Sequence, residues 1–186
     1  TVDFAWPGAS VVGRRLFYNQ SGTASPLRYD GNDAAINDHD DFAIATDKTA
    51  YLPGSGAATF ANVSSYTKGI NGIMVDIQGT HGDIGVDDFE FYRGNNNSQT
   101  QWTAAPPPSS MSVRSGAGVS GSDRVELVWG NDAVKKEWLL VIVRANDDTG
   151  IPQKVGWRLG IGDVFFFGNA LGDSGSGDSA LLANVN

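Results

Sequence analysis

The chain contains no cysteine, only two histidines and no excess of basic residues. The absence of cysteine excludes disulfide bonds and cysteine-ligated zinc or iron–sulfur sites. Because 13 Lys and Arg residues face 21 Asp and Glu residues, the formal net charge is −8. This acidity argues against nucleic acid as a partner, since that binding needs basic surface to displace counterions. No apolar run approaches the roughly 20 residues of a membrane-spanning helix, so we expect no membrane insertion.

Glutamate is also scarce, because only three of the 21 acidic residues are Glu and the other 18 are Asp. Glu favours helix interiors, whereas Asp, Gly and Pro favour turns. The chain has 24 Gly and 7 Pro, so its composition predicts many short strands joined by tight turns. We expect a single domain, residues 1–186, excised from a larger secreted protein.

Strand patterns recur along the chain, whereas helical periodicity is weak. Within residues 123–129, for example, Val125, Leu127 and Trp129 share one face, and Arg124 and Glu126 share the other. A turn of helix is expected only within residues 31–47. The pattern predicts an all-β fold, a two-sheet antiparallel β-sandwich of about 8–10 strands, jelly-roll-like, with a closed barrel less favoured. The predicted strands are residues 11–19, 57–63, 69–78, 86–93, 111–114, 123–129, 136–144 and 163–167.

Residues 30–47 form the strongest local signal, because eight acid or amide side chains, six Asp and two Asn, lie in this short stretch. Such crowded negative charge needs a neutralising partner, and Ca²⁺ takes 6–8 oxygen ligands from carboxylates, amides and carbonyls. The alternative is a solvated acidic loop with Asx-turns. The spacing is not that of an EF-hand. The predicted calcium ligands are Asp30, Asn32, Asp38, Asp40, Asp41 and Asp47.

Aromatic residues in polar loops are the second signal. Trp102 and Trp157 lie in segments rich in Gly, Pro and Asn. An exposed ring can stack on the C–H face of a sugar while a neighbour such as Arg158 bonds the hydroxyls. Tyr92, on a strand, offers a flat-face alternative. The competing interpretation is that each loop Trp folds down over the end of the sandwich.

Catalytic patterns are few. Asp88 and Glu90 fall on one face of a predicted strand, with Cα atoms about 6.6–7 Å apart. Carboxyl groups of glycosidases lie at about 5–9.5 Å, so a glycosidase or lyase is a third hypothesis. Adjacent carboxylates on a strand usually share a solvated face, and we therefore expect a protein that is not an enzyme.

Three stretches carry a family resemblance: residues 16–21 with 29–33, residues 41–54 with 58–76, and residues 162–175. They resemble a β-sandwich module of large secreted bacterial proteins, found beside polysaccharide-degrading and dockerin-like domains. The resemblance implies an extracellular, non-catalytic module that binds carbohydrate and contains structural calcium. It makes Asp30, Asn32, Asp41 and Asp47 the first-choice ligands. Residues 151–162 depart from the pattern.

The expected function is therefore that of a secreted carbohydrate-binding module, stabilised by Ca²⁺. It would target a polysaccharide, which could be an acidic one, and would lie beside neighbouring domains of the same protein. The main alternative is an adhesive or structural assembly module that binds no sugar. A cluster of exposed aromatics in a concavity would favour the first hypothesis, and a large exposed apolar patch would favour the second.

Overall fold

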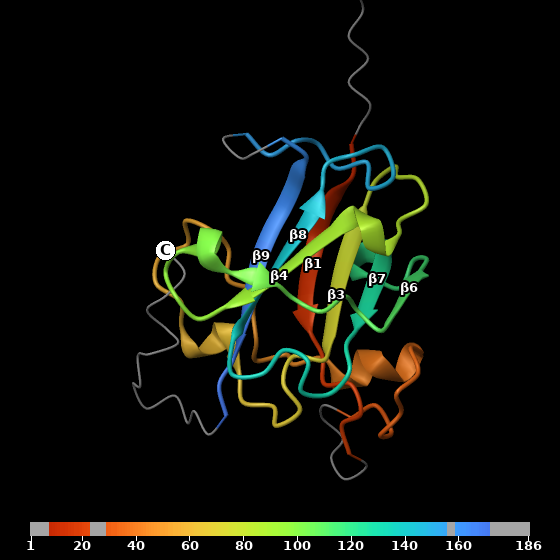
Figure 1. Cartoon of the computed structure of the whole chain (residues 1–186). Coiled ribbons are helices and arrows are strands. Elements are labelled where there is room, and N and C mark those ends of the chain that lie inside the picture. Colours follow the sequence, from red (N-terminus) through yellow and green to blue (C-terminus); the bar gives the residue numbers. More distant parts are fainter. Residues whose placement is uncertain (1–7, 23–28, 156–158, 172–186) are drawn as a thin grey trace, which may run out of the picture.

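The structure is a computed structural model that describes residues 8–22, 29–155 and 159–171. The described residues form two sheets that face each other (Figure 1), which confirms the predicted all-β sandwich. The strands are β1 (Ser10–Leu16), β2 (Val63–Ser64), β3 (Gly72–Gln78), β4 (Phe89–Gly94), β5 (Thr103–Ala104), β6 (Ser110–Arg114), β7 (Asp123–Val128), β8 (Trp138–Arg144) and β9 (Ile161–Asn169).

One sheet has four strands in the order β1-β3-β7-β6, and the other has five in the order β2-β9-β8-β4-β5. All pairings are antiparallel except the short parallel pair β2–β9. The apolar segment at residues 136–144 was predicted as a central strand, and β8 indeed lies between β9 and β4. The jelly-roll-like connectivity stays a prediction.

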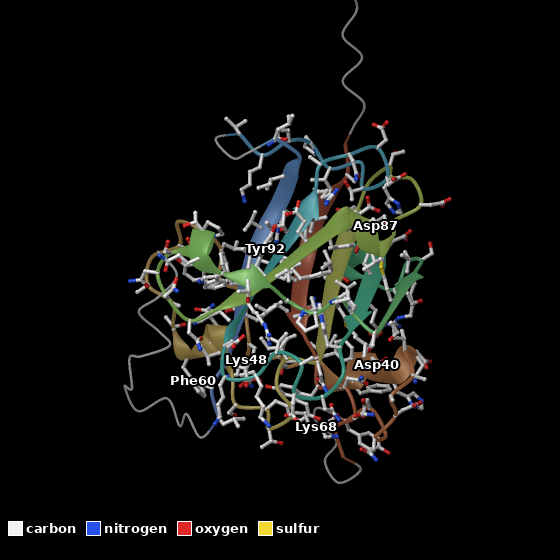
Figure 2. The ribbon with its side chains drawn as sticks, in the orientation of Figure 1. Asp40, Lys48, Phe60, Lys68, Asp87 and Tyr92 are labelled. Carbon is white, nitrogen blue, oxygen red and sulfur yellow. The ribbon has the colours of Figure 1, made fainter. Side chains whose placement is uncertain are left out.

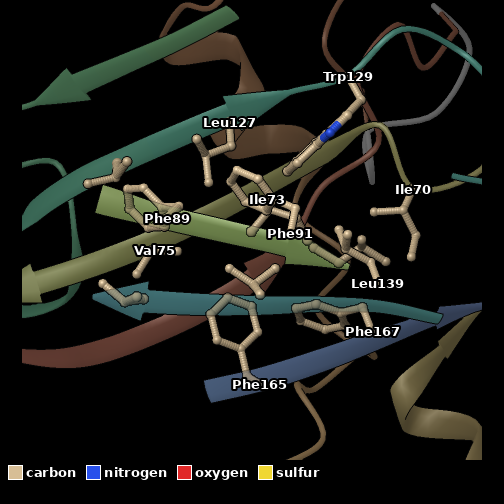
Figure 3. Packing of buried hydrophobic residues seen from close by; sticks show 14 of the residues in the cluster. Ile70, Ile73, Val75, Phe89, Phe91, Leu127, Trp129, Leu139, Phe165 and Phe167 are labelled. Carbon is tan, nitrogen blue, oxygen red and sulfur yellow. The ribbon is translucent and has the colours of Figure 1, made fainter. Parts of the chain in front are cut away.

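The space between the sheets holds the main hydrophobic core. Inward residues of both sheets meet there, and the ring of Phe91 packs edge-on against Trp129 at 5.1 Å between centroids (Figure 3). Val125 and Leu127 belong to the same cluster, so the inward face predicted for residues 123–129 is confirmed. Because each strand contributes alternate residues, the opposite faces of both sheets remain to be covered.

Both outer faces are covered by loops and short 3-10 turns. On the five-stranded sheet, residues such as Trp138 and Phe166 form a second apolar cluster with Tyr51 and Trp102. On the four-stranded sheet, Met74 packs with residues that include Ala43, which lies in the turn η1. The turns are η1 (Asp38–Ala43), η2 (Phe60–Asn62), η3 (Val86–Asp88), η4 (Gln99–Gln101) and η5 (Val119–Gly121).

Sequence and structure differ most at residues 57–63. The predicted strand is largely absent there, because η2 occupies its second half and only Val63 enters β2. The side-chain oxygen of Asn62 accepts the backbone N–H of Thr59 at 2.7 Å, and the Asn62 N–H is bonded to the Thr59 carbonyl at 2.9 Å. These local bonds favour a turn over a strand. The helical turn expected within residues 31–47 is present as η1.

No helix among the described residues is long and apolar enough to cross a membrane.

Candidate functional site

The acidic loop, defined here as residues 29–47, begins at a carboxylate that is fully buried. Asp30 accepts the backbone N–H groups of Gln20 and Asn32, the latter at 2.9 Å, and its own N–H donates to the Ser21 hydroxyl at 3.1 Å. Burial raises the pKa of Asp30, while the two backbone hydrogen bonds to its carboxylate oppose that shift. Asp30 therefore joins the acidic loop to the end of β1 through protein donors.

The turn η1 continues this loop over the outer face of the four-stranded sheet, where Figure 2 labels Asp40. Asn37 caps the turn by accepting the His39 N–H at 2.8 Å, and the Asn37 N–H donates to Asp40 Oδ2 at 2.9 Å. This reciprocal arrangement is a capping box. It turns the Asp40 side chain inward, where it is fully buried, whereas Asp38 stays exposed.

Beneath η1 lies a row of charged side chains that we call the arginine network: Arg15, Asp40, Asp41, Asp76, Arg114, Arg124 and Glu126. The Arg124 guanidinium donates two hydrogen bonds to Asp76: Nε to Oδ1 at 2.7 Å, and Nη2 to Oδ2 at 3.0 Å. Asp41 accepts hydrogen bonds from both Arg114 and Arg124, the latter at 2.8 Å. The network therefore ties η1 to β6 and β7.

Electrostatics in the network follow from burial and pairing. Asp76 is fully buried, which by itself raises its pKa, but the hydrogen bonds and charge of Arg124 outweigh burial and leave the pKa below its ordinary value. For the Arg124 guanidinium, burial lowers the pKa, yet Asp76 and Asp41 produce a net increase. Both groups of this pair thus remain charged while almost inaccessible to solvent.

The six predicted calcium ligands do not converge. Asp41 is bonded to two arginines, the Asp47 carboxylate lies 3.5 Å from Lys48 Nζ, and Asn32 is exposed. The part of the chain that the structure describes contains no group of three or more His or acidic side chains that could hold a metal ion. Because Asp40 and Asp41 already bind protein donors, these residues do not fit a calcium ion, and calcium stays a prediction from the sequence.

A pocket of about 680 Å³ lies at the other end of the sandwich, which is the upper end in Figure 1. The loops after β3 and β8 form it. The Gly82 N–H donates to the Asp148 carbonyl at 2.8 Å, and the Gly150 carbonyl accepts the Ala9 N–H at 2.8 Å. Gly150 has φ +63°, and a Cβ there would lie 2.1 Å from the Thr80 carbonyl oxygen, so only glycine permits this close approach.

The pocket is lined by both polar and apolar side chains. The His81 ring lies between two acceptors: its Nε2 is 3.3 Å from Asp123 Oδ2, and its Nδ1 is 2.8 Å from the Gly82 carbonyl oxygen. Leu159 is 91% exposed. No Lys or Arg is among the described lining residues. The polar side chains are Thr80, His81, Asn146, Asp147 and Gln153, and the larger apolar ones are Ile151 and Leu159.

A second groove, of about 380 Å³, runs along the free edge of β1. Its cations Arg14 and Lys48 each have an acidic partner: Arg14 Nε lies 2.6 Å from Asp163, and Lys48 Nζ lies 3.5 Å from Asp47. Lys48 also sits 3.6 Å from the centroid of the Phe60 ring; Figure 2 labels both residues. The Arg14–Asp163 pair joins β1 of one sheet to β9 of the other, and Lys48 joins its loop to η2.

The residues predicted to stack on sugars differ in where the structure places them. Trp102 was expected to be exposed, but it is only 7% exposed; it packs edge-on against Phe166 and donates Nε1–H to the Asn96 carbonyl at 3.0 Å. Its polar loop folds the ring over the outer face of the five-stranded sheet, so the expectation of an exposed ring is wrong. Tyr92 is half-buried against the same cluster. Trp157 and Arg158 lie outside the described residues.

The two carboxylates considered for catalysis, Asp88 and Glu90, also lie in places that differ from the prediction. Asp88 belongs to η3, is 5% exposed, and accepts hydrogen bonds from the Gly85 N–H at 2.8 Å and Asn146 Nδ2 at 2.7 Å. Glu90 lies on β4 and accepts the Tyr92 hydroxyl at 2.9 Å. The expectation that Asp88 and Glu90 share a solvated strand face is therefore wrong, because the strand begins only at Phe89.

Several residues of both regions were not among the predicted site residues. Arg124 and Glu126 were placed on the outward face of their strand, where they do lie, but an outward position does not show that they are buried. His81, in the loop after β3, is far in sequence from Asp147 and Gln153, which share the loop after β8, so the three residues meet only in the fold. The one available signal was opposite charge on facing strands, since Asp76 and Arg124 are direct cross-strand partners.

Comparison of the chain with protein-family models, with curated proteins and with solved structures gave no significant match.

Proposed function

We propose that this protein is a secreted, non-catalytic carbohydrate-binding module that holds a polysaccharide chain in the pocket lined by His81, Asp147, Gln153 and Leu159. The supporting observation is the pocket itself. Its volume of about 680 Å³ falls in the range of about 300–1,000 Å³ found for small-molecule sites. Its carboxylate, amide and imidazole groups match sugar hydroxyls, while Leu159 and Ile151 offer apolar contact for C–H groups.

The charge of the pocket favours a neutral polysaccharide over an acidic one. Asp147 is the charged side chain among the described lining residues, and the whole chain carries a net charge of −8. A uronate polymer would be repelled both by Asp147 and by the net negative charge of the whole chain. Arg158, the predicted partner for sugars, directly precedes Leu159 in the sequence.

The absence of an enzymatic role is part of the proposal. Asp88 is committed to two hydrogen bonds within the protein, and Glu90 pairs with Arg144 at 3.5 Å. Neither lines the pocket. A pair of carboxylates flanking a cleft, which glycoside hydrolysis requires, is not provided by these two residues.

Isothermal titration against neutral and uronate polysaccharides tests the proposal. We expect dissociation constants between about 1 mM and 1 μM for a neutral polymer, which corresponds to roughly −4 to −8 kcal/mol. Leu159→Asp should weaken this binding about tenfold. Phe42→Asp is a matched control, because Phe42 is 64% exposed but lies on η1, away from the pocket. Equal affinity of both variants and the wild type would place the ligand elsewhere.

One observation favours an assembly module as the second candidate. Val155 and Leu159 are 95% and 91% exposed, and both belong to the connection between β8 and β9. Exposed apolar side chains of this kind can dock a neighbouring domain of the same protein. In that case Leu159→Asp would abolish domain association in sedimentation experiments on a longer chain, and no glycan would bind to the wild type.

A further inference from the structure

The groove along the free edge of β1 differs from the rest of this acidic chain, because its charged lining side chains are all cationic. They are Arg14, Arg15 and Lys48, and no Asp or Glu is among the described lining residues. The chain as a whole has a net charge of −8, but charges more than about 8 Å away are largely screened at physiological ionic strength. The cations at the groove therefore dominate its local potential, which favours an anion.

Arg15 is the cation with the least compensation. Its Nε lies 3.5 Å from Asp76, but both oxygens of Asp76 already accept hydrogen bonds from Arg124. Arg15 Nε is buried and finds no acceptor among the described residues, whereas the side chain as a whole is 37% exposed. The Arg15 guanidinium therefore keeps its positive charge and has N–H donors available for a ligand.

The other two cations are paired to different degrees. Arg14 Nε lies 2.6 Å from one oxygen of Asp163, and Lys154 Nζ lies 4.0 Å from the other. Because one carboxylate serves two cations there, positive charge is in excess at this end of the groove as well. Lys48 is buried and has its own partner in Asp47 at 3.5 Å, so we assign the ligand contacts to the two arginines.

The wall opposite β1 supplies neutral donors. It is formed by residues 44–52, and the Ala45 N–H joins it to β1 by a hydrogen bond to the Leu16 carbonyl at 2.8 Å. Thr46 and Thr49 line this wall and are exposed, and neither hydroxyl bonds to another described residue. The groove thus has N–H donors on one wall and O–H donors on the other. A tetrahedral oxyanion can accept hydrogen bonds from both walls, and guanidinium groups bind such anions through paired N–H donors.

We propose that this groove binds a tetrahedral oxyanion of the sulfate or phosphate type, with the Arg15 guanidinium as its main contact and Arg14 beside it. The hydroxyls of Thr46 and Thr49 complete the site from the opposite wall. The groove of about 380 Å³ shares no described lining residue with the pocket that contains His81. The anion site is therefore independent of the proposed glycan site.

NMR titration of the ¹⁵N-labelled chain with sodium sulfate tests this inference, with sodium chloride at equal ionic strength as the reference. We expect saturable shifts of the Arg15, Thr46 and Thr49 amides, with a dissociation constant of about 1 mM. Inorganic phosphate should shift the same amides. Sulfate shifts that match those of chloride, or that gather outside the groove, would overturn the proposal.

Variants of Arg15 test whether its guanidinium is the main contact. Arg15→Gln should weaken sulfate binding about tenfold, because the charged donor is lost. Arg15→Lys should bind with intermediate affinity, since it keeps the charge but not the paired donors. Arg144→Gln is the matched control: Arg144 is 48% exposed and has one acidic neighbour, Glu90 at 3.5 Å, but does not line the groove. Wild-type affinity in both Arg15 variants, or an equal loss in Arg144→Gln, would contradict the proposal.

Methyl sulfate distinguishes an ester group of a larger molecule from a free ion. If its affinity equals or exceeds that of inorganic sulfate, the ligand is an ester, and the apolar residues Val12, Ile44 and Leu52 of the groove are available to contact its carbon atoms. A much weaker affinity than that of inorganic sulfate assigns the groove to the free ion. Both results support an oxyanion site, whereas the absence of saturable binding by either anion would refute it.

Discussion

Under η1, charged side chains are buried and bonded to one another, whereas at the opposite end of the sandwich polar side chains line an open pocket. Asp76 and Glu126 are fully buried, and Arg124 is only 5% exposed. Asp147 and Gln153 are exposed. The first group is bonded to partners within the chain and shielded from solvent, whereas the second is open to solvent, even where a side chain such as Gln153 also bonds to its own loop.

The burial difference predicts a large difference in sensitivity to mutation. Arg124→Met removes the guanidinium that neutralises Asp76 and Asp41. It leaves the buried Asp76 with only Arg15, at 3.5 Å, as a cationic partner, which costs about 3 kcal/mol in the free energy of unfolding. Urea unfolding measures this loss. Arg144→Met is the control: its side chain is 48% exposed and pairs with Glu90 at 3.5 Å, so about 0–1 kcal/mol is expected. Equal losses in the two variants would remove the distinction between the regions.

A second variant tests whether a buried aromatic residue, like the buried charged residues, contributes to stability and not to glycan binding. Trp102→Ala should reduce the free energy of unfolding by about 3 kcal/mol, because the ring is buried against Phe166. Its effect on glycan affinity should be nil, since Trp102 does not line the pocket. Trp102→Phe should recover most of the stability, although it loses the hydrogen bond to the Asn96 carbonyl. Loss of glycan binding at unchanged stability would restore Trp102 as a ligand residue.

The smallest effect on stability is expected in the pocket. Asp147→Ala should lower the affinity for a neutral glycan about tenfold, or about 1.4 kcal/mol, while the free energy of unfolding changes by less than about 0.5 kcal/mol. Titration calorimetry and urea unfolding on the same preparation separate the two. Asp87→Ala is the control, because Asp87 is exposed but does not line the pocket (Figure 2). A similar loss of affinity in both variants would indicate a general charge effect.

Much of the fold was predictable because strand alternation is a local property. Residues 123–129 placed Val125 and Leu127 inward and Glu126 outward, and the structure agrees. The burial of Glu126 was not predictable, because it depends on η1, which comes from more than 80 positions earlier in the chain. Local alternation tells which face a residue is on, but not what covers that face.

The functional regions were harder to predict for the same reason. The acidic loop was singled out as needing positive charge, and the structure places Arg114 of β6 and Arg124 of β7 against its Asp41, which the sequence did not indicate. Calcium stays a prediction. For Trp102, the polar sequence around the residue suggested an exposed ring, whereas the ring is buried. Its neighbours are polar, yet Gly94 leaves room for the ring, since a Cβ there would lie 2.5 Å from Trp102 Cγ. Such a fit between two strands is a tertiary property.

The edges of the two sheets also determine how this protein behaves at high concentration. The five-stranded sheet ends in β2 and β5, each only two residues long, and these offer too few backbone groups to recruit a strand from another molecule. On the other sheet, β1 is interrupted by a register shift between Val11 and Gly13 and carries Arg14 and Arg15. These are devices that discourage edge-to-edge aggregation. At these three edges, strand pairing between copies is therefore discouraged even where copies are crowded on a surface or along one long chain, and β6 is the remaining edge at which copies could pair.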